Sequence, residues 1–218
     1  LLSLPVACGD TKVVERGKGD GIFVTTSGIG EVIGGWSPRP HEASPGDLVV
    51  VTGPIGDHGI AVLVARENLR LKSPVVSDVA PLSPMLNRLV EEAGEVVLFM
   101  RDPTRGGLGV TLNEVAPKIP GTVVIREEAI PVREEVRGVS EILGFDPLYL
   151  ANEGKAVLIV RKGAEEKILS ILREFPEGAG SRVIGEVREG EKGVLLLTRV
   201  GGARILDYPV GEQLPRIC

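Results

Sequence analysis

Cysteine is scarce in this sequence, since only Cys8 and Cys218 among its 218 residues carry a thiol. Neither belongs to a C-x-x-C pair, and two cysteines cannot form a disulfide framework. This excludes a small disulfide-stabilised secreted domain and favours a reducing cytoplasm as the location of the protein. Because Cys8 lies in an apolar stretch, we predict that its side chain packs in the core.

Long apolar runs and an excess of positive charge are absent as well. No run approaches the roughly 18–20 apolar residues needed to cross a bilayer, and no signal leader opens the chain, so we predict neither membrane insertion nor export. The sequence holds 25 Lys and Arg against 30 Asp and Glu, a net charge of −5. This balance argues against binding of nucleic acid, because neutralising phosphates requires clustered Lys and Arg.

Amide side chains are equally rare. Gln213 is the only glutamine, and the asparagines are Asn68, Asn87, Asn113 and Asn152. Few thermolabile amides beside plentiful Glu, Lys, Arg and Pro indicate an organism that grows at high temperature.

Glycine and proline, 29 and 16 residues respectively, divide the chain into short elements. We predict two strands near the start, at 10–15 and 22–26, joined by a hairpin connection at 16–21. The stretch WSPRP at 36–40 continues neither a helix nor a central strand. We therefore place a domain boundary at Trp36.

After this boundary, short apolar runs typical of strands alternate with segments of helical periodicity. The segments 183–187 and 194–198 are predicted to pair as an antiparallel hairpin across the charged turn 188–192. Helices and strands that alternate, with hairpins mixed in, predict an α/β fold shading into α+β. The predicted strands are 48–52, 96–100, 122–125, 156–160, 183–187, 194–198 and 204–207, and the predicted helices are 60–65, 82–93, 108–116, 132–143 and 164–175.

The final residues, 208–218, contain two prolines and no periodicity, so we predict a mobile tail. It ends in PRIC at 215–218, which places the thiol of Cys218 beside the α-carboxylate. One interpretation is a disordered terminus without function. The other is functional, because soluble proteins usually avoid an exposed cysteine, and a thiol on a flexible arm can reach several sites.

A second candidate is DPTRGG at 102–107, between a predicted strand and a predicted helix. In that place glycines let the backbone approach a phosphate, helix N–H groups point at it, and Asp102 can hold Mg²⁺. The segment is not a Walker P-loop, because it lacks G-x-x-x-x-G-K-[ST]. A purely structural strand-to-helix turn is the alternative.

Two further stretches carry polar side chains beside predicted strands. GDTK at 9–12 brings a carboxylate, a hydroxyl and an ammonium within three residues, which suits a metal–phosphate site; a solvated strand edge is the alternative. ANEG at 151–154 precedes the predicted strand at 156–160. Glu153 there is either a turn residue or a carboxylate directed into a cleft.

Together these stretches resemble one family, the hydrogenase maturation factor HypE. The family belongs to a superfamily that includes aminoimidazole-ribonucleotide synthetase, selenophosphate synthetase and thiamine-phosphate kinase, which implies ATP binding and phosphoryl transfer. The residues that carry the resemblance are GDTKVVERGKGDGIFVTTSGIG at 9–30, TGPIGDHGIA at 52–61, RDPTRGGL at 101–108, ANEG at 151–154 and PRIC at 215–218.

The resemblance also implies a division of the chain into three parts. Residues 1–36 are expected to be the remnant of a β-rich N-terminal ATP-binding domain. Residues 37–207 would form an α+β C-terminal domain with a mixed sheet, and 208–218 a flexible tail ending in the acceptor cysteine. The superfamily's acidic, metal-binding ATP motif precedes the point where this sequence starts, at Leu1. We therefore expect an N-terminal portion to be missing and this chain alone to be inactive.

The activity that the resemblance implies is ATP-dependent dehydration of a carbamoyl group on the C-terminal cysteine to a thiocyanate, which supplies cyanide ligands to nickel–iron hydrogenase. Cys218 would carry the group, and Glu153 would be the base, assisted by Lys12. ATP and Mg²⁺ are the implied cofactors, with Asp10 and Asp102 as metal ligands. The residues expected to bind the nucleotide are Asp10, Thr11, Lys12, Asp102, Thr104, Arg105, Gly106 and Gly107.

The implied partners are the carbamoyltransferase HypF, the HypC–HypD complex and a second copy of the chain in a homodimer. Two other functions remain open. One is a phosphotransferase of the same superfamily that acts on a free small molecule, with an incidental tail. The other is a non-catalytic carrier of the thiol.

Overall fold

The computed structural model describes residues 5–19, 21–66 and 75–209, and the chain divides into two units, Leu1–Val32 and Ile33–Cys218. This division lies before Trp36, the predicted boundary. Trp36 packs with the second unit, where its indole Nε1 donates a hydrogen bond to the carbonyl oxygen of Val97 at 2.9 Å. None of the helices in the described ranges is long and apolar enough to cross a membrane.

The first unit contains no helix or strand among its described residues, so the strands predicted at 10–15 and 22–26 are wrong. A two-stranded hairpin is marginally stable in water unless one face is packed. Here Ile22 and Phe23 are 89% and 82% exposed, so within the described part of this unit such a face is not packed. The prediction that Cys8 is buried is also wrong: Cys8 is exposed, because the described part of this unit has no core to receive it.

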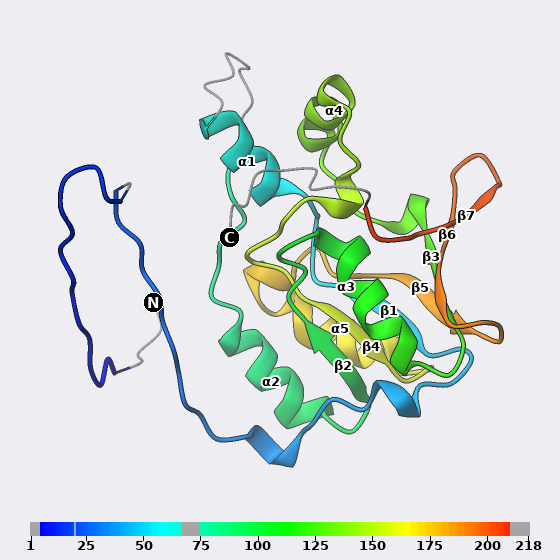
Figure 1. Ribbon diagram of the computed structural model, residues 1–218. Coiled ribbons are helices and arrows are strands. Elements are labelled where there is room, and N and C mark those ends of the chain that lie inside the picture. The colour runs from blue at the N-terminus through cyan, green and yellow to red at the C-terminus, as the bar shows by residue number, and fades with distance from the viewer. Residues whose placement is uncertain (1–4, 20, 67–74, 210–218) are drawn as a thin grey trace. The chain divides into compact units, whose positions relative to one another are not determined.

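The second unit is built on a seven-stranded sheet in the order β2-β4-β1-β5-β3-β6-β7 (Figure 1). All neighbouring strands are antiparallel except β3 and β6, which are parallel. The mixed sheet predicted from the sequence is therefore confirmed. The strands are β1 (Leu48–Val51), β2 (Val97–Arg101), β3 (Thr122–Arg126), β4 (Val157–Val160), β5 (Arg182–Arg188), β6 (Gly193–Leu197) and β7 (Ala203–Ile205).

The predicted hairpin between the segments 183–187 and 194–198 is wrong, although both segments are strands. β3 lies between them: Val123 is paired with Val187 of β5 on one side and with Val194 of β6 on the other. The three central residues of β3 are all buried, and because their side chains alternate between the two faces of the sheet, both faces are covered there. Such a strand is stable in the middle of a sheet, with hydrogen-bonded neighbours on both sides.

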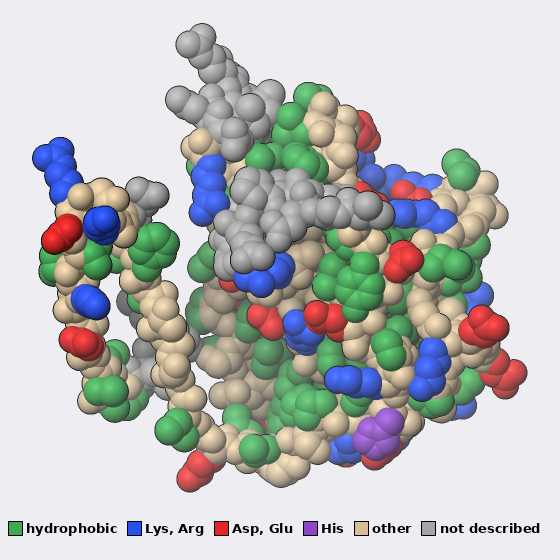
Figure 2. Space-filling model, in the orientation of Figure 1, with side chains coloured by type: hydrophobic (Ala, Val, Ile, Leu, Met, Phe, Trp, Pro, Cys, Tyr) green, Lys and Arg blue, Asp and Glu red, His purple; other side chains and the backbone are tan. Residues whose placement is uncertain are grey.

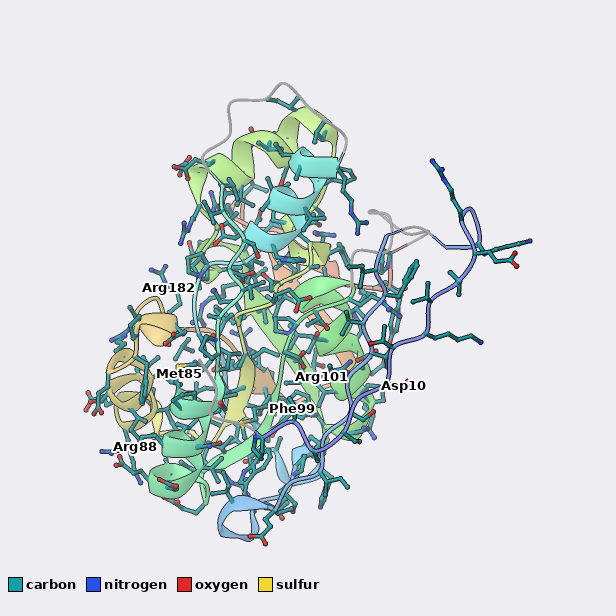
Figure 3. The ribbon with its side chains drawn as sticks, turned by 90° about the vertical axis from the view of Figure 1, so that its left-hand side faces the viewer. Asp10, Met85, Arg88, Phe99, Arg101 and Arg182 are labelled. Carbon is teal, nitrogen blue, oxygen red and sulfur yellow. The ribbon has the colours of Figure 1, made fainter. Side chains whose placement is uncertain are left out.

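The described residues form five α-helices, each near a predicted position: α1 (Asp57–Arg66), α2 (Ser83–Ala93), α3 (Gly107–Val115), α4 (Glu134–Leu143) and α5 (Glu165–Arg173). Helices α2, α3 and α5 cover the sheet, whereas α1 and α4 pack against each other in a separate cluster. Because side chains alternate along a strand, Val50 and Leu158 pack with α2 and α5, whereas Val49 and Ile159 pack with α3 on the other face. Figure 3 shows Met85 and Arg88 on α2, with Phe99 and Arg101 on β2. Met85 is fully buried, while Arg88 pairs with Glu92 at the surface.

Candidate functional site

Three of the motif stretches meet at one end of the sheet. Val157, the first residue of β4, is paired with both Val51 at the end of β1 and Arg101 at the end of β2. The segments that follow β1 and β2 and the segment that precedes β4 therefore emerge at the same edge. These segments contain TGPIGDHG, DPTRGG and ANEG, and together they form the candidate site.

The DPTRGG turn connects β2 to α3, as predicted. Gly106 and Gly107 have φ values of +71° and +62°, which favour glycine. A Cβ atom on Gly107 would lie 2.5 Å from the carbonyl oxygen of Leu150, so this glycine also permits close packing. Its N–H donates to the carbonyl oxygen of Thr104 at 3.0 Å. That N–H is thus used within the turn, and phosphate binding by Gly106 and Gly107 stays a prediction.

Asn152 joins the three motif stretches. Its amide Nδ2 donates to the carbonyl oxygens of Pro103 and Leu150, at 3.0 Å each. Its Oδ1 accepts a hydrogen bond from the N–H of Gly56 at 2.8 Å. Asn152 is completely buried, so every one of these bonds replaces water that the groups have lost. The side chain fixes the DPTRGG turn against the start of α1 and the ANEG segment.

Glu153 is half-buried beside Asn152, and its backbone is held by Asp78. Asp78 Oδ1 accepts a hydrogen bond from the N–H of Glu153 at 3.1 Å, and Asp78 Oδ2 forms an ion pair with Lys155 Nζ at 3.3 Å. The Asp78 and Lys155 side chains are only 3% and 10% exposed. At Gly154, a Cβ atom would lie 1.7 Å from the carbonyl oxygen of Asp78. Contacts with Asp78 at Glu153, Gly154 and Lys155 therefore fix the position of the segment that carries the predicted base.

Two more buried polar residues begin α1 near this site. Asp57 is 1% exposed, and its Oδ2 lies 3.3 Å from Arg133 Nε, while its Oδ1 has no partner within the described ranges. Burial raises the pKa of Asp57, an effect that Arg133 opposes and the nearby Asp78 carboxylate increases. The Nδ1 atom of His58 lies 2.9 Å from the Oγ atom of Ser77, at hydrogen-bond distance.

Asp102 has the properties of one ligand of a magnesium–nucleotide complex. It is exposed just after β2, and its carboxylate has no partner among the residues that the structure describes. Mg²⁺ is usually held by one or two carboxylates together with substrate phosphates. No group of three or more His, Cys, Asp or Glu side chains in the described segments could hold a metal alone. Binding of Mg²⁺ here would therefore require phosphate oxygens as further ligands.

The other predicted site residues are distributed over the chain. Thr104 is half-buried and Arg105 exposed in the DPTRGG turn. Asp10, Thr11 and Lys12 are exposed in the first unit, where Asp10 Oδ1 accepts from the N–H of Thr11 at 2.8 Å. Because these three belong to the first unit, their approach to Asp102 stays a prediction. Cys218 and the rest of the predicted acceptor motif lie outside the described residues.

Comparison with known proteins places this site in a family. The family model of the AIR synthase related protein, C-terminal domain, matches residues 44–198. These residues contain the sheet and the DPTRGG and ANEG segments. The chain therefore belongs to the AIR synthase related proteins.

Within that family, the resemblance to HypE predicted from the sequence is confirmed. The chain is 46% identical over 216 residues to the carbamoyl dehydratase HypE of Rhizobium leguminosarum bv. viciae, which covers 99% of this chain and 62% of the relative. It therefore spans about 62% of the length of that curated relative.

Solved structures of HypE have the same fold. A crystal structure of Escherichia coli HypE matches with a TM-score of 0.78 and 42% identity, covering 84% of this chain and 56% of that one. HypE in complex with ATP matches with a TM-score of 0.77 and 42% identity, over 83% and 55%. A HypE–HypF complex matches with a TM-score of 0.72 and 43% identity, over 77% and 54%.

Sequence reasoning missed Asn152, Asp78 and Lys155 as parts of the site. Asn152 and Lys155 flank Glu153 and could have been noticed from that position. Asp78 lies 75 positions from its hydrogen-bond partner Glu153, in a segment without a recognised motif. No local pattern in the sequence indicates this contact.

Proposed function

We propose that the full-length protein dehydrates a carbamoyl group on its C-terminal cysteine to a thiocyanate, with ATP as the activating substrate, in the maturation of nickel–iron hydrogenase. The proposal is supported by relatives named carbamoyl dehydratase HypE and by a similar HypE solved with ATP. The single observation that carries it is the convergence of the DPTRGG and ANEG segments on Asn152. This brings a candidate phosphate-binding turn beside a candidate base.

The chemistry explains why ATP is needed. A thiocarboxamide, R–S–C(=O)–NH₂, loses water poorly because hydroxide is a poor leaving group. Transfer of the γ-phosphoryl group to the carboxamide oxygen forms a C–O–P bond and releases ADP. Cleavage of the C–O bond and loss of the two nitrogen protons, one to the base and one to the departing phosphate, then yield R–S–C≡N and inorganic phosphate. The site must neutralise phosphate charge and accept a proton.

The proposed roles follow from the chemistry of the side chains. Glu153, fixed by Asp78 through its backbone, accepts a proton from the carboxamide nitrogen, with Lys12 assisting. Lys12 and Arg105 neutralise charge on the phosphates, and Asp10 and Asp102 hold Mg²⁺. The ion, when bound, draws charge from the phosphate oxygens. Thr11, Thr104, Gly106 and Gly107 are proposed to contact the nucleotide.

Mass spectrometry of the full-length protein tests the proposal. After incubation with HypF, carbamoyl phosphate and Mg·ATP, the peptide that ends at Cys218 should gain a carbamoyl group and then lose one water. Without ATP the reaction should stop at the carbamoyl form. The Cys218→Ser variant is the control and should remain unmodified. Dehydration that proceeds without ATP, or on the Cys218→Ser variant, would contradict the proposal.

The proposed partners are HypF, the HypC–HypD complex and a second copy of the chain, with the cytoplasm as the location. The solved HypE–HypF complex supports HypF.

A variant that lacks 215–218 separates this function from that of a phosphotransferase acting on a free substrate. Such a phosphotransferase should keep its ATP turnover in this variant, whereas the proposed dehydratase should lose its product.

A further inference from the structure

A pocket lies in the second unit, and no residue of the motif stretches lines it. Its volume is about 350 Å³, within the range of small-molecule sites. It is formed by α4 and the segments on either side of it, the short 3₁₀ helix Pro147–Tyr149, the turn between β6 and β7, and β7. None of its lining residues belongs to the candidate site described above.

Three arginines from three separate elements line this pocket: Arg137 of α4, Arg199 of the β6–β7 turn and Arg204 of β7. Figure 2 shows basic side chains gathered between α4 and this turn. Two carboxylates, Glu127 and Asp146, also line it. The pocket therefore has an excess of positive charge, although the chain as a whole is acidic.

Both carboxylates are already engaged in the fold. Asp146 Oδ2 lies 2.7 Å from Arg204 Nη2, and its Oδ1 accepts a hydrogen bond from the N–H of Leu148 at 3.0 Å. Glu127 Oε2 accepts a hydrogen bond from the backbone N–H of Arg199 at 3.0 Å. Neither carboxylate pairs with the guanidinium of Arg137 or Arg199 in the part of the chain that the structure describes.

Among the residues that the structure describes, no carboxylate thus pairs with the guanidinium group of Arg137 or Arg199. Arg137 is half-buried, and a charge removed from water is costly unless an opposite charge pairs with it. The planar guanidinium group binds carboxylate and phosphate oxygens through paired hydrogen bonds. An oxyanion in the pocket would supply the acceptors that the described protein groups do not.

The remaining wall of the pocket is apolar. Ile130 and Leu148 are 4% and 6% exposed, and Val132 and Phe145 are half-buried beside them. An inorganic ion would leave this surface in contact with water, whereas an apolar group on the ligand would cover it.

We infer that this pocket binds a small organic anion, a carboxylate or phosphate carried on an apolar group. The oxyanion is bound by Arg137 and Arg199, and the apolar group packs against Phe145, Ile130 and Val132. Arg204 contributes charge while it remains paired with Asp146. This site is independent of the proposed dehydratase activity.

Isothermal titration calorimetry of the chain with four probes tests the inference. Phenyl phosphate and benzoate carry an oxyanion on a ring, inorganic phosphate lacks the ring, and benzyl alcohol lacks the charge. Phenyl phosphate, benzoate or both should bind at least tenfold more tightly than inorganic phosphate, and benzyl alcohol should not bind. The tighter of the two ring probes identifies the preferred oxyanion.

Variants assign the binding to this pocket. Arg137→Ala and Arg199→Ala should each weaken binding of the ring probe at least tenfold. Phe145→Ala should reduce its advantage over inorganic phosphate. Arg188→Ala, which removes a guanidinium paired with Glu186 outside the pocket, is the matched control and should bind like the parent chain. Circular dichroism confirms that each variant is folded, and Arg137→Lys replaces Arg137→Ala if it is not.

Two results would overturn the inference. One is the absence of binding by both ring probes. The other is binding that persists unchanged in the folded Arg137 and Arg199 variants, which would place the probe elsewhere on the chain.

Discussion

At Gly107 in the candidate site, both the backbone conformation and the space around the Cα atom favour glycine over any other residue. Its φ of +62° lies in the left-handed region, and a Cβ atom there would be 2.5 Å and 2.7 Å from the carbonyl oxygens of Leu150 and Leu148. Backbone atoms of a neighbouring segment cannot move aside as the end of a flexible side chain can. The close contact between the DPTRGG turn and residues 148–150, which lead into the ANEG segment, therefore depends on this glycine.

Gly107→Ala should lower the free energy of unfolding by at least about 2 kcal/mol, since backbone strain and the clash each contribute. Urea denaturation measures the change. Gly138→Ala is the control: nothing lies within 4 Å of a Cβ at this position in α4, so alanine should raise stability by up to about 1 kcal/mol. A Gly107→Ala variant as stable as the parent would contradict the predicted contact.

Asp57 predicts a dependence of stability on pH. Burial raises its pKa above the ordinary value of 3.8, so between 3.8 and the raised pKa the folded state binds the proton more tightly than the unfolded state. This contribution to stability is complete below pH 3.8 and is lost as the pH rises through the raised pKa. In Asp57→Asn, which cannot ionise, this loss should disappear.

Urea denaturation of the parent chain and of Asp57→Asn at a series of pH values from 3.5 upward tests this. The unfolding free energy of the parent should fall relative to that of the variant as the pH rises. A constant difference between the two would show that the pKa of Asp57 is the same in the folded and unfolded states.

At the level of elements, the two faces of the sheet are stabilised by different helices. Leu89 of α2 is completely buried in the cluster that α2 and α5 form with Val50 and Leu158. The amphipathic patterns of α2 and α5 could be predicted from the sequence, because apolar residues recur at helical spacing. The strand order could not, because β3 inserts between β5 and β6 from a distant part of the chain.

Leu89→Ala should lower the free energy of unfolding by about 2–5 kcal/mol, because it removes buried methyl groups and leaves a cavity. Thermal or urea denaturation measures the loss. Ile142→Ala in α4 is the matched control, since Ile142 is 72% exposed and its truncation should change stability by less than about 0.5 kcal/mol. Equal effects of the two substitutions would contradict this packing.

At the level of the whole molecule, the core formed by the described residues lies in the second unit. All three hydrophobic clusters lie between residues 36 and 206, whereas every described residue of the first unit is exposed. Folding is driven by burial of apolar surface. The second unit should therefore fold without the first.

A chain of residues 33–218 should unfold with the same free energy and the same denaturant dependence as 1–218. Fluorescence of Trp36, which is retained, reports the transition. A loss of more than about 1 kcal/mol on removal of 1–32 would be a sizeable part of a typical folding free energy and would show that the first unit contributes to the core.

The sequence by itself determined the positions of the helices and of the strands after Trp36, the motif stretches and the family. These depend on local spacing of apolar residues, glycines and prolines, which a single segment contains. Only the tertiary structure decided the order of the strands, the contact of Asp78 with Glu153 and the gathering of three arginines at one pocket. Those features join residues far apart along the chain, and their partners depend on which surfaces remain to be covered once all elements pack together.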